Sequence, residues 1–553
     1  MSPSNFRLRP DAPAAPAMGP VLDVKDLRIS YSARTVVHGV SFQAARGETT
    51  AVIGESGSGK STIARAIIGL LPQGAHLESG TITLAGDTLT RRPSHEFDGI
   101  RGRRIGFVPQ DPSNSLDPVA TIGAHVGEMF RLHTTLSRAE TRERVLALLD
   151  RVGLSDPVLR FSQYPHELSG GMRQRVLIAG AIALNPDLIV ADEPTSALDV
   201  TVQRQILDLL DGLRAEHGTS ILLITHDLAI AKDRARDTIV LRSGRIEEQD
   251  DTAKIFAAPR ADYTKRLIAD LPVFAPRPPP ADIPAADAAD AVVVSNLRVA
   301  YPTGRHQTRL AVDSVSFRVR AGTTHAIVGE SGSGKTTILR CLTGLIMPDA
   351  GTILIEGEDI AHARGPARRA MLRHIQLVYQ NPWASLDPRQ SVRQIIEEPL
   401  RNFAIDSPAG RRARVEAMLD RVHLPRTLLD RRPAEMSGGQ CQRVALARAL
   451  VIEPRILVLD EVVSALDVTV QARVLDLLAE LRRDLGLTYI FVSHDLAVVR
   501  QIADTLSVIR HGRQVERGPA DTLFDAPAEP YTKLLLAAIP GQGNAAPVQL
   551  QET

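Results

Sequence analysis

The sequence has little cysteine, few aromatic residues, almost no net charge and no long apolar run. Cys341 and Cys441 have no CxxC or Cys/His spacing around them, which argues against a disulfide framework or a zinc site and favours a reducing cytoplasm. With 65 Lys and Arg against 64 Asp and Glu, the chain has no broad basic field, so we expect no nucleic acid partner. No stretch approaches the roughly 18 apolar residues that a membrane-spanning helix needs.

What the sequence contains instead is a long internal repeat. The stretch GESGSGKS recurs as GESGSGKT, and the later stretch LSGGMRQR recurs as MSGGQCQR. The first pair is related by a step from Lys60 to Lys335, and the second by a nearly equal step from Ser169 to Ser437. Such a long period indicates duplication of a whole domain, because solenoid repeats have periods of roughly 20–50 residues.

The repeat and the local composition divide the chain into five segments. Residues 272–290 carry six prolines and are typical of an extended linker. The N-terminal stretch is rich in Pro and Ala and lacks the continuous apolar core of a secretion signal. We predict a disordered tail at 1–20, a first domain at 21–271, the linker at 272–290, a second domain at 291–540 and a C-terminal tail at 541–553.

Each domain carries the pattern of an α/β fold. Short apolar runs such as TTAVI and LIVAD alternate with helix-compatible segments, which predicts a mostly parallel sheet. The glycine-rich stretch follows one such strand and precedes a helix, as a P-loop NTPase requires. After Gln110, a capping box of Ser137 and Glu140 opens a helix with an apolar stripe, and Ser407 with Pro408 does so in the second half. We therefore expect a helical subdomain inserted into each core.

The two glycine-rich stretches predict two nucleotide sites. Glycines let backbone N–H groups approach phosphate oxygens, the lysine reaches the β- and γ-phosphates, and the hydroxyl after it binds Mg²⁺. We therefore expect ATP and Mg²⁺ as cofactors in both halves. The predicted nucleotide-binding residues of the first half are Gly54, Glu55, Ser56, Gly57, Ser58, Gly59, Lys60, Ser61 and Thr62. Those of the second half are Gly329, Glu330, Ser331, Gly332, Ser333, Gly334, Lys335, Thr336 and Thr337.

An Asp-Glu pair ends a buried apolar strand in each half. Asp192 and Asp460 close these strands, where a carboxylate can hold Mg²⁺. Glu193 and Glu461 follow as candidate catalytic residues that polarise the attacking water. A strand that ends in Asp-Glu is common by itself. Its position downstream of a phosphate loop in both copies favours the catalytic interpretation.

His226 and His494 each follow another short apolar strand. A single histidine at such a place is more often structural. The two recur with the same spacing as Ser169 and Ser437, which favours an imidazole that faces the γ-phosphate.

A second candidate anion site precedes a long predicted helix in each half. A hydroxyl and two glycines at a helix start can bind phosphate, and the alternative is a serine N-cap with glycine turn chemistry. Two halves that face each other head to tail would give each stretch a nucleotide to bind. The residues are Ser169, Gly170, Gly171, Ser437, Gly438 and Gly439.

With these motifs in this order, the chain resembles the ATPase component of an ABC transporter, in a fused form with both nucleotide-binding domains on one polypeptide. The resemblance covers about residues 21–271 and 291–540. It implies intramolecular pairing of the two domains, in which the serine-glycine stretch of each half completes the nucleotide site of the other. It also implies that Gln110 and Gln380 monitor Mg²⁺ and the attacking water. The metal-binding set is then Ser61, Gln110, Asp192, Thr336, Gln380 and Asp460.

Further residues match positions of this family. Tyr31 and Tyr301 stand where the family has its adenine-stacking aromatic, and the alternative is a tyrosine packed on a strand face. Asp199 and Asp467, in SALD, match the loop at the dimer seam.

A closer similarity concerns the segments DPSNSLDP and NPWASLDPR, the repeated SALDVTVQ, and the endings YTKRL and YTKLL. These resemble ATPases of the peptide/nickel importer group, which serves dipeptides, oligopeptides, glutathione or related solutes. Some relatives carry a cysteine cluster for an iron–sulfur centre near these endings. This chain has none there, and we predict no such centre.

The resemblance implies the ATP-hydrolysing subunit of an importer, held peripherally on the cytoplasmic side of the cell's inner membrane. Its implied partners are two transmembrane permease subunits and, indirectly, an extracytoplasmic solute-binding protein. Val462 and Val463 stand where the first half has Pro194 and Thr195. These changes spare every charged or phosphate-facing residue, so we expect both sites to hydrolyse ATP.

Several alternatives stay open at this point. The cargo could be nickel, glutathione or another non-peptide solute. A tandem ABC protein that acts on ribosomes or DNA is disfavoured by the near-zero net charge and the Pro/Ala linker. A sugar importer ATPase commonly has one degraded site, and a scaffold without catalysis would not need two intact glutamates.

Overall fold

The computed structural model describes residues 19–32, 34–90, 92–196, 198–274, 289–302, 308–464 and 466–541. The chain divides into two compact units, residues 1–198 with 202–269 and residues 199–201 with 270–553. Nearly all of the predicted tails and most of the predicted linker lie outside the described residues. Both units have the α/β architecture that the sequence predicts.

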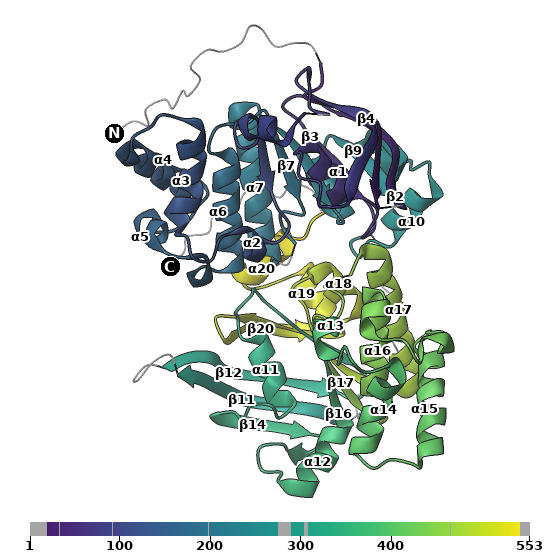
Figure 1. Ribbon diagram of the computed structural model, residues 1–553. Helices are drawn as coiled ribbons and strands as arrows, with labels where there is room; N and C mark the ends of the chain where they lie inside the picture. Colours follow the sequence, from purple (N-terminus) through teal and green to yellow (C-terminus); the bar gives the residue numbers. More distant parts are fainter. Residues whose placement is uncertain are drawn as a thin grey trace. The chain divides into compact units, whose positions relative to one another are not determined.

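The described part of the first unit contains two sheets, which are visible in Figure 1. Their strands are β1 (Leu22–Tyr31), β2 (Arg34–Ala44), β3 (Thr49–Ile53), β4 (Ala75–Leu84), β5 (Asp87–Thr88), β6 (Ile105–Val108), β7 (Leu188–Asp192), β8 (Ser220–Thr225), β9 (Asp237–Arg242) and β10 (Arg245–Asp251). The antiparallel sheet has the order β2-β1-β4-β5, and the larger sheet has the order β10-β9-β3-β8-β7-β6. All neighbours in the larger sheet pair in parallel except β10 with β9. The carboxyl ends of β3, β7 and β8 therefore meet at one edge.

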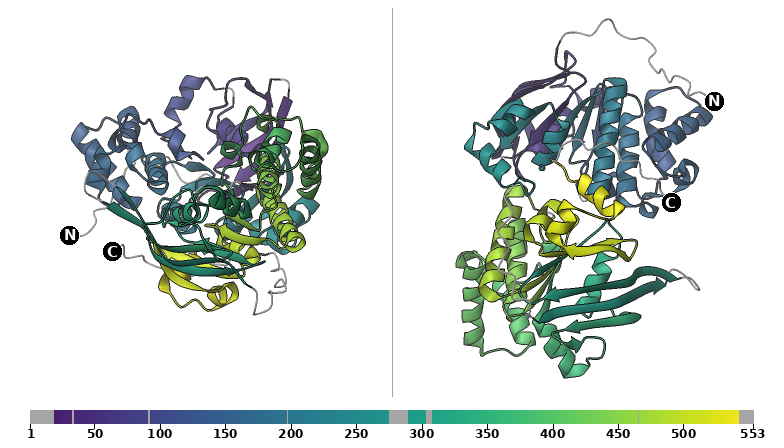
Figure 2. Two further views of the ribbon diagram at one scale, coloured as in Figure 1. Left: turned by 90° about the horizontal axis from the view of Figure 1, so that it is seen from below. Right: turned by 180° about the vertical axis from the view of Figure 1, so that it is seen from behind.

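The helices of the first unit cover the larger sheet and build the inserted subdomain. They are α1 (Lys60–Ile67), α2 (Pro112–Ser115), α3 (Ile122–His133), α4 (Arg138–Arg151), α5 (Pro157–Ser162), α6 (Gly170–Ile182), α7 (Val200–His217), α8 (Leu228–Arg234), α9 (Thr252–Ala257) and α10 (Asp262–Ala269), with short 3₁₀ turns at Ser94–Gly99 and Pro165–Glu167. Helices α3, α4 and α5 lie together on the side of this unit away from β1, β2 and β4 (Figure 1 and Figure 2).

The predicted capping box opens the longest helix of this subdomain. Ser137 accepts from the N–H of Glu140, and the Glu140 carboxylate accepts from the N–H of Ser137. Val145 and Leu149 of the predicted stripe are fully buried. The helical subdomain between Gln110 and the serine-glycine stretch is confirmed, because the stripe packs with its other helices in an apolar cluster that continues to one face of the larger sheet.

The second unit repeats this plan. Its strands are β11 (Asp290–Pro302), β12 (Thr308–Arg320), β13 (Thr324–Val328), β14 (Ala350–Ile355), β15 (Glu358–Asp359), β16 (Ile375–Val378), β17 (Ile456–Asp460), β18 (Thr488–Val492), β19 (Thr505–Arg510) and β20 (Arg513–Pro519). Its helices are α11 (Lys335–Leu342), α12 (Gly365–His374), α13 (Pro382–Ser385), α14 (Val392–Asn402), α15 (Pro408–Arg421), α16 (Gly438–Leu450), α17 (Val468–Leu485), α18 (Leu496–Ile502), α19 (Ala520–Asp525) and α20 (Pro530–Ala537), with 3₁₀ turns at Arg426–Leu428 and Pro433–Glu435. The sheet orders are β12-β11-β14-β15 and β16-β17-β18-β13-β19-β20.

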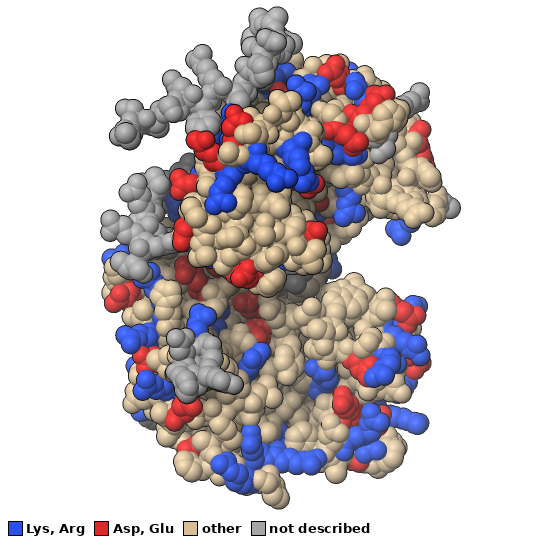
Figure 3. Space-filling view, turned by 60° about the vertical axis from the view of Figure 1, so that its left-hand side comes forward, with Lys and Arg blue, Asp and Glu red and all other residues tan. Residues whose placement is uncertain are grey.

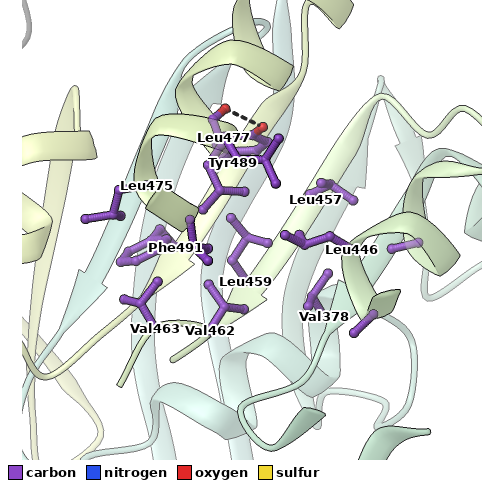
Figure 4. Packing of buried hydrophobic residues seen from close by; sticks show 14 of the residues in the cluster. Val378, Leu446, Leu457, Leu459, Val462, Val463, Leu475, Leu477, Tyr489 and Phe491 are labelled. Atoms are coloured by element: carbon purple, nitrogen blue, oxygen red, sulfur yellow. Dashed lines mark hydrogen bonds between the residues drawn. The ribbon is translucent and has the colours of Figure 1, made fainter. Parts of the chain in front are cut away.

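The core of the second unit lies between its larger sheet and helices α16 and α17. Leu457 and Leu459 of β17 and Phe491 of β18 are fully buried, and Figure 4 shows Leu446 of α16 and Leu475 of α17 packed around them. Each large buried apolar side chain contributes on the order of 1.5–3 kcal/mol to stability. This packing fixes the end of β17, from which Asp460 and Glu461 leave the sheet.

Candidate functional site

In both units the glycine-rich loop joins a buried strand to a helix that begins at the loop lysine. The loop follows β3 and precedes α1 in the first unit. Lys60 Nζ donates to the carbonyl oxygens of Gly54 at 2.7 Å and Glu55 at 2.9 Å. The equivalent two bonds of Lys335 are 2.8 and 2.7 Å long. Burial lowers the pKa of Lys335 although several carboxylates lie near it.

The first glycine of each loop has a backbone position that only glycine can fill. Gly54 has φ +154°, and a Cβ there would come within 2.1 Å of the carbonyl oxygen of Leu241 in β9. Gly329 has φ +151°, and a Cβ there would lie 2.1 Å from the carbonyl oxygen of Ile509 in β19. The loop therefore lies directly against the backbone of the neighbouring strand.

The hydroxyl after the lysine meets the strand-end aspartate in the first unit. Ser61 Oγ donates to Asp192 Oδ1 at 3.1 Å, and burial raises the pKa of Asp192 despite this bond. Among the described residues of the second unit, no hydrogen bond joins Thr336 to Asp460. Burial, together with the neighbouring charge of Glu461, raises the pKa of Asp460 to about 6.

The candidate catalytic glutamate contacts a glutamine and a histidine from two other elements. Glu193 Oε2 accepts from Gln110 Nε2 at 2.7 Å and lies 3.2 Å from His226 Nδ1. The corresponding distances in the second unit are 2.6 and 3.2 Å, and they join Gln380, Glu461 and His494. The structure thus brings together three residues per unit that the sequence assigned separately.

Electrostatics within this cluster favour a charged pair. Burial opposes ionisation of Glu193, but its hydrogen bond to His226 and the charges of His226 and Lys60 outweigh burial, so its pKa lies below the ordinary value. Burial likewise opposes protonation of His226, but Glu193 outweighs it and raises the pKa of the imidazole. Glu461 and His494 shift in the same directions for the same reasons. Each glutamate is therefore held ionised, as a group that orients water must be.

The backbone at each glutamate is left-handed. Glu193 has φ +48° and its N–H donates to the carbonyl oxygen of Ile224 at 2.8 Å. Glu461 has φ +47° and its N–H donates to the carbonyl oxygen of Val492 at 2.9 Å. A non-glycine residue in this region costs on the order of 1–2 kcal/mol. The strand-to-strand hydrogen bond holds the turn that aims the carboxylate away from the core.

The serine-glycine stretches begin helices α6 and α16. Ser169 is the N-cap of α6 and accepts from the N–H of Met172. Ser437 is the N-cap of α16 and forms a capping box with Gln440. Within each unit, these serines therefore fulfil the capping role that the sequence left open as the alternative.

The two candidate stacking tyrosines lie beside the start of the helix that follows the loop. The hydroxyl of Tyr31 is 3.3 Å from Thr62 Oγ1, and that of Tyr301 is 3.5 Å from Thr337 Oγ1. Both residues are partly exposed. Their position next to the loop is compatible with an adenine ring and with packing on the strand.

The structure adds one residue per unit that sequence reasoning missed. The hydroxyl of Tyr263 accepts from the N–H of Glu55 at 3.2 Å, and that of Tyr531 accepts from the N–H of Glu330 at the same distance. The sequence held the signal for this contact, because the two YTK endings recur with the same spacing as the serine-glycine stretches.

The described ranges contain neither a preformed cluster of metal ligands nor a membrane-spanning helix. No group of three or more His, Cys, Asp or Glu side chains in these ranges has the arrangement of a metal site. None of the helices in the described part of the chain combines the length and hydropathy that a membrane crossing requires.

Residues 37–196 and 312–464 match the family described as ABC transporter, which is more than half of the chain. The chain belongs to the ABC transporter family. As a member of this family it is an ATPase with two ABC domains. Residues 515–552 of this ABC protein also match the oligopeptide/dipeptide transporter C-terminal region.

Similar proteins align over nearly the whole ABC chain. The peptidoglycan transport ATP-binding protein YejF of Agrobacterium fabrum is 43% identical over 94% of this chain and 96% of its own length. The oligopeptide transport ATP-binding protein OppD of Mycobacterium tuberculosis is 39% identical over 95% of this chain and 99% of its own length. The glutathione import ATP-binding protein GsiA of Escherichia coli is 38% identical over 94% of this chain and 90% of its own length.

Proposed function

We propose that this chain drives the uptake of peptides, either dipeptides and oligopeptides or a related small solute that contains peptide bonds. The cargoes named for its relatives are peptidoglycan, oligopeptides and glutathione, and each of them contains amide-linked amino acids. The match of its last segment to an oligopeptide/dipeptide transporter region supports the same class of cargo. Nickel and other solutes without peptide bonds are the alternative.

The observation that carries the catalytic part of the proposal is the duplicated glutamate cluster. In each unit a half-buried, ionised glutamate lies within hydrogen-bond distance of a glutamine amide and an imidazole. We assign Glu193 and Glu461 to orient the water that attacks the γ-phosphate. His226 and His494 hold these carboxylates and face the γ-phosphate. Gln110 and Gln380 link each carboxylate to the helical subdomain.

The donors around the loop fit a magnesium ion. The Ser61 hydroxyl and the Asp192 carboxylate, joined at 3.1 Å, are the hard oxygen ligands that Mg²⁺ prefers. Thr336 and Asp460 offer the same donor types in the second unit. Mg²⁺ would neutralise phosphate charge there, while Lys60 and Lys335 turn from loop carbonyls to the β- and γ-phosphates.

We further propose that the two units pair within one chain, so that Ser437, Gly438 and Gly439 complete the site of Lys60 and the first unit's stretch completes that of Lys335. Paired units would close on ATP and reopen after hydrolysis. Two membrane permease subunits would convert this motion into transport on the cytoplasmic side of the membrane, with an external binding protein that delivers cargo.

Cross-linking tests the pairing directly. Cys341 and Cys441 are buried, and burial raises the pKa of both thiols to about 11, so they give little background reactivity near pH 7. We expect the Ser56→Cys, Ser437→Cys variant to form a bismaleimide cross-link that increases with ATP. A chain that never forms it, in any nucleotide state, would contradict the pairing.

Uptake by cells tests the cargo. Deletion of the protein should abolish uptake of a labelled tripeptide, and the intact chain should restore it, whereas the chain with Glu193→Gln and Glu461→Gln should not. Competition with unlabelled dipeptide, glutathione and nickel salts identifies the preferred class. Competition by nickel alone would replace the peptide assignment by the alternative.

The face drawn in Figure 3 gives no support to a ribosome or DNA partner. On the face drawn in Figure 3, basic and acidic side chains are interspersed. A protein that binds a phosphate backbone presents clustered Lys and Arg. Salt-sensitive copurification with ribosomes or DNA would reverse this assessment.

A further inference from the structure

The peptide group between the first two residues of each glycine-rich loop is held at both ends. Its carbonyl oxygen, on Gly54, accepts from Lys60 Nζ at 2.7 Å. Its N–H, on Glu55, donates to the hydroxyl of Tyr263 at 3.2 Å. The two groups point in opposite directions from a trans peptide, so the lysine can leave the carbonyl for phosphate while the bond to the tyrosine stays in place. The tyrosine is then the side chain that keeps the peptide in position.

The tyrosine ring is fixed by the strand that the loop lies against. The guanidinium of Arg242 lies 4.8 Å from the centroid of the Tyr263 ring, and that of Arg510 lies 4.9 Å from the Tyr531 ring. Arg242 directly follows Leu241, whose carbonyl oxygen faces Gly54. Such a cation–π contact restrains the orientation of the ring. Tyr263 and Tyr531 are 7% and 6% exposed, and burial raises the pKa of Tyr531, so this phenol stays protonated.

Helix α10, which carries Tyr263, is anchored to the hairpin of β9 and β10. The Glu248 carboxylate of β10 accepts from the N–H groups of Arg260 and Ala261 at 2.9 and 3.0 Å, just before α10. At the tip of the hairpin, Gly244 N–H donates to the carbonyl oxygen of Ser58 at 2.9 Å. The loop, the hairpin of β9 and β10, and helix α10 thus form a closed set of contacts.

The second unit repeats every member of this set. Glu516 accepts from the N–H groups of Ala528 and Glu529 at 2.8 and 3.4 Å, ahead of α20. Gly512 N–H donates to the carbonyl oxygen of Ser333 at 2.9 Å. The recurrence of the whole arrangement in both units argues against a chance packing contact.

We propose that Tyr263 and Tyr531 are positioning residues that hold the glycine-rich loops in the shape that binds ATP, and that the chain after β10 and β20 serves to place them. This inference rests on the proposed assignment of the loops to ATP. It gives a role to the segment matched as an oligopeptide/dipeptide transporter C-terminal region, since that match begins at Val515 and contains Glu516 and Tyr531. The hydroxyl acts on the loop and not on the reacting atoms.

Removal of the hydroxyl should weaken ATP binding and leave the chemical step nearly unchanged. In Tyr263→Phe and Tyr531→Phe the ring and its arginine contact remain, but the loop N–H loses its acceptor. A hydrogen bond of this kind contributes about 1 kcal/mol, which corresponds to about fivefold in affinity. We expect the KM for ATP to rise by about fivefold in the double variant, with kcat within about twofold of the parent.

The experiment uses the full chain and Mg-ATP, with a buried tyrosine elsewhere as the control. Tyr489 is fully buried and its hydroxyl donates to the carbonyl oxygen of Leu478 at 2.9 Å. It pairs with Thr324, at the end of β13 away from the loop. Tyr489→Phe removes one buried hydroxyl bond and should lower the melting temperature without changing the KM for ATP. Equilibrium dialysis with labelled ATP measures affinity apart from turnover.

Hydrogen exchange gives a readout at the contact itself. Peptides that cover residues 54–60 and 329–335 should exchange faster in the tyrosine double variant and at the parental rate in Tyr489→Phe. Glu248→Gln and Glu516→Gln should also raise the KM for ATP and the exchange rate of the loop peptides, but by a smaller factor, because these changes only loosen the helix that carries the tyrosine.

Unchanged ATP affinity and unchanged loop exchange in the tyrosine double variant would overturn this inference. A fall in kcat with unchanged affinity would also overturn it. The Lys60→Ala, Lys335→Ala variant separates this failure from failure of the proposed sites. If the lysine variant lost ATP binding while the tyrosine variant did not, only the positioning role would be wrong. If the lysine variant kept ATP binding, the assignment of the loops to ATP would be wrong as well.

Discussion

Around the candidate catalytic glutamate the two ABC units have almost the same contacts, whereas around the neighbouring aspartate they differ. The glutamine-to-glutamate distance is 2.7 Å in the first unit and 2.6 Å in the second, and the histidine distance is 3.2 Å in both. Asp192 accepts from Ser61, but Asp460 has no such bond to Thr336 among the described residues, and burial raises the pKa of Asp460 to about 6. Duplication has therefore preserved the contacts of the glutamate that we propose orients water, and has relaxed those of the aspartate that we propose holds Mg²⁺.

Replacement of the two glutamates, whose contacts are the same in both units, should change ATP hydrolysis more than any other substitution. Glu193→Gln and Glu461→Gln each remove the carboxylate that we propose polarises water, and we expect each to lower hydrolysis at its own site by about 10²–10⁴-fold. The amide keeps the shape, so ATP should stay bound. Single-turnover measurements on each single variant and on the double variant give the two rates separately.

If the two sites are equivalent and hydrolyse ATP independently, each single variant should retain about half of the parental turnover. Loss of all turnover in both single variants would show that the sites are coupled. Full turnover in the double variant would remove these glutamates from the mechanism.

A smaller effect is expected from a buried histidine that only the second unit has. His325 of β13 contacts Thr505 Oγ1 at 2.8 Å and Ser507 Oγ at 2.9 Å and stacks on Phe317, whereas the first unit has Thr50 at this place. Burial lowers the pKa of His325 to about 3. The folded pKa is below the unfolded value of about 6.5, so stability is present above pH 6.5 and is lost as the pH falls.

Between pH 6.5 and 5 this histidine should lower the free energy of unfolding of the second unit by about 2 kcal/mol. In His325→Thr that dependence should largely vanish, although the variant starts less stable at pH 7 because Thr505 loses its partner and Ser507 keeps only its bond to Gln514. Calorimetric unfolding at pH 5 and pH 7 measures both effects. An identical loss on acidification in parent and variant would contradict the assignment.

The next prediction uses the aspartates, in magnesium-free buffer. The folded pKa of Asp460 is raised above its unfolded value, so the folded state loses stability as the pH rises from about 4 to 6. At pH 7 the buried charge is therefore unfavourable, and Asp460→Asn should raise the free energy of unfolding by about 1–3 kcal/mol. Hydrolysis at that site should still fall, because the proposed Mg²⁺ ligand is gone.

Asp192→Asn is the matched control for this prediction. Burial also raises the pKa of Asp192, but its carboxylate accepts from Ser61 and an amide is a weaker acceptor, so the gain in stability should be smaller. Equal gains in the two variants would show that the absent Thr336 contact has no energetic consequence. Chemical denaturation of both variants at pH 7 provides the measurement.

The sequence predicted most of this architecture because its signals are local. The strand endings at Asp192 and Asp460, the capping box at Ser137 and the lysine at each helix start are set by neighbours along the chain. Pattern was sufficient for these features. The grouping of each glutamate with its glutamine and histidine was not predicted, because the sequence assigned the three residues separately, and the structure brings them together where the parallel strands end.

The contacts that the sequence did not predict depend on side chains far apart in the chain. Tyr263 reaches Glu55 from the opposite end of the first unit's sequence, and no local pattern gives its direction. The raised pKa of Asp460 depends on how deeply the end of β17 is buried and on the lack of a hydrogen bond from the Thr336 hydroxyl among the described residues. The roles of Ser169 and Ser437 beyond helix capping concern a contact between units and stay predictions.

The smallest expected effect concerns the two valines that follow Glu461. Val462 and Val463 are 2% exposed, and Figure 4 shows them beside Leu459 and Phe491. The first unit has proline and threonine at these positions and keeps the same glutamate contacts. We therefore expect Val462→Pro with Val463→Thr to leave ATP turnover within about twofold of the parent, and to cost about 1–2 kcal/mol of stability because a hydroxyl replaces a buried methyl. A large change in turnover would show that the segment after the glutamate, and not only the Gln380 and His494 contacts, sets the rate in the second unit.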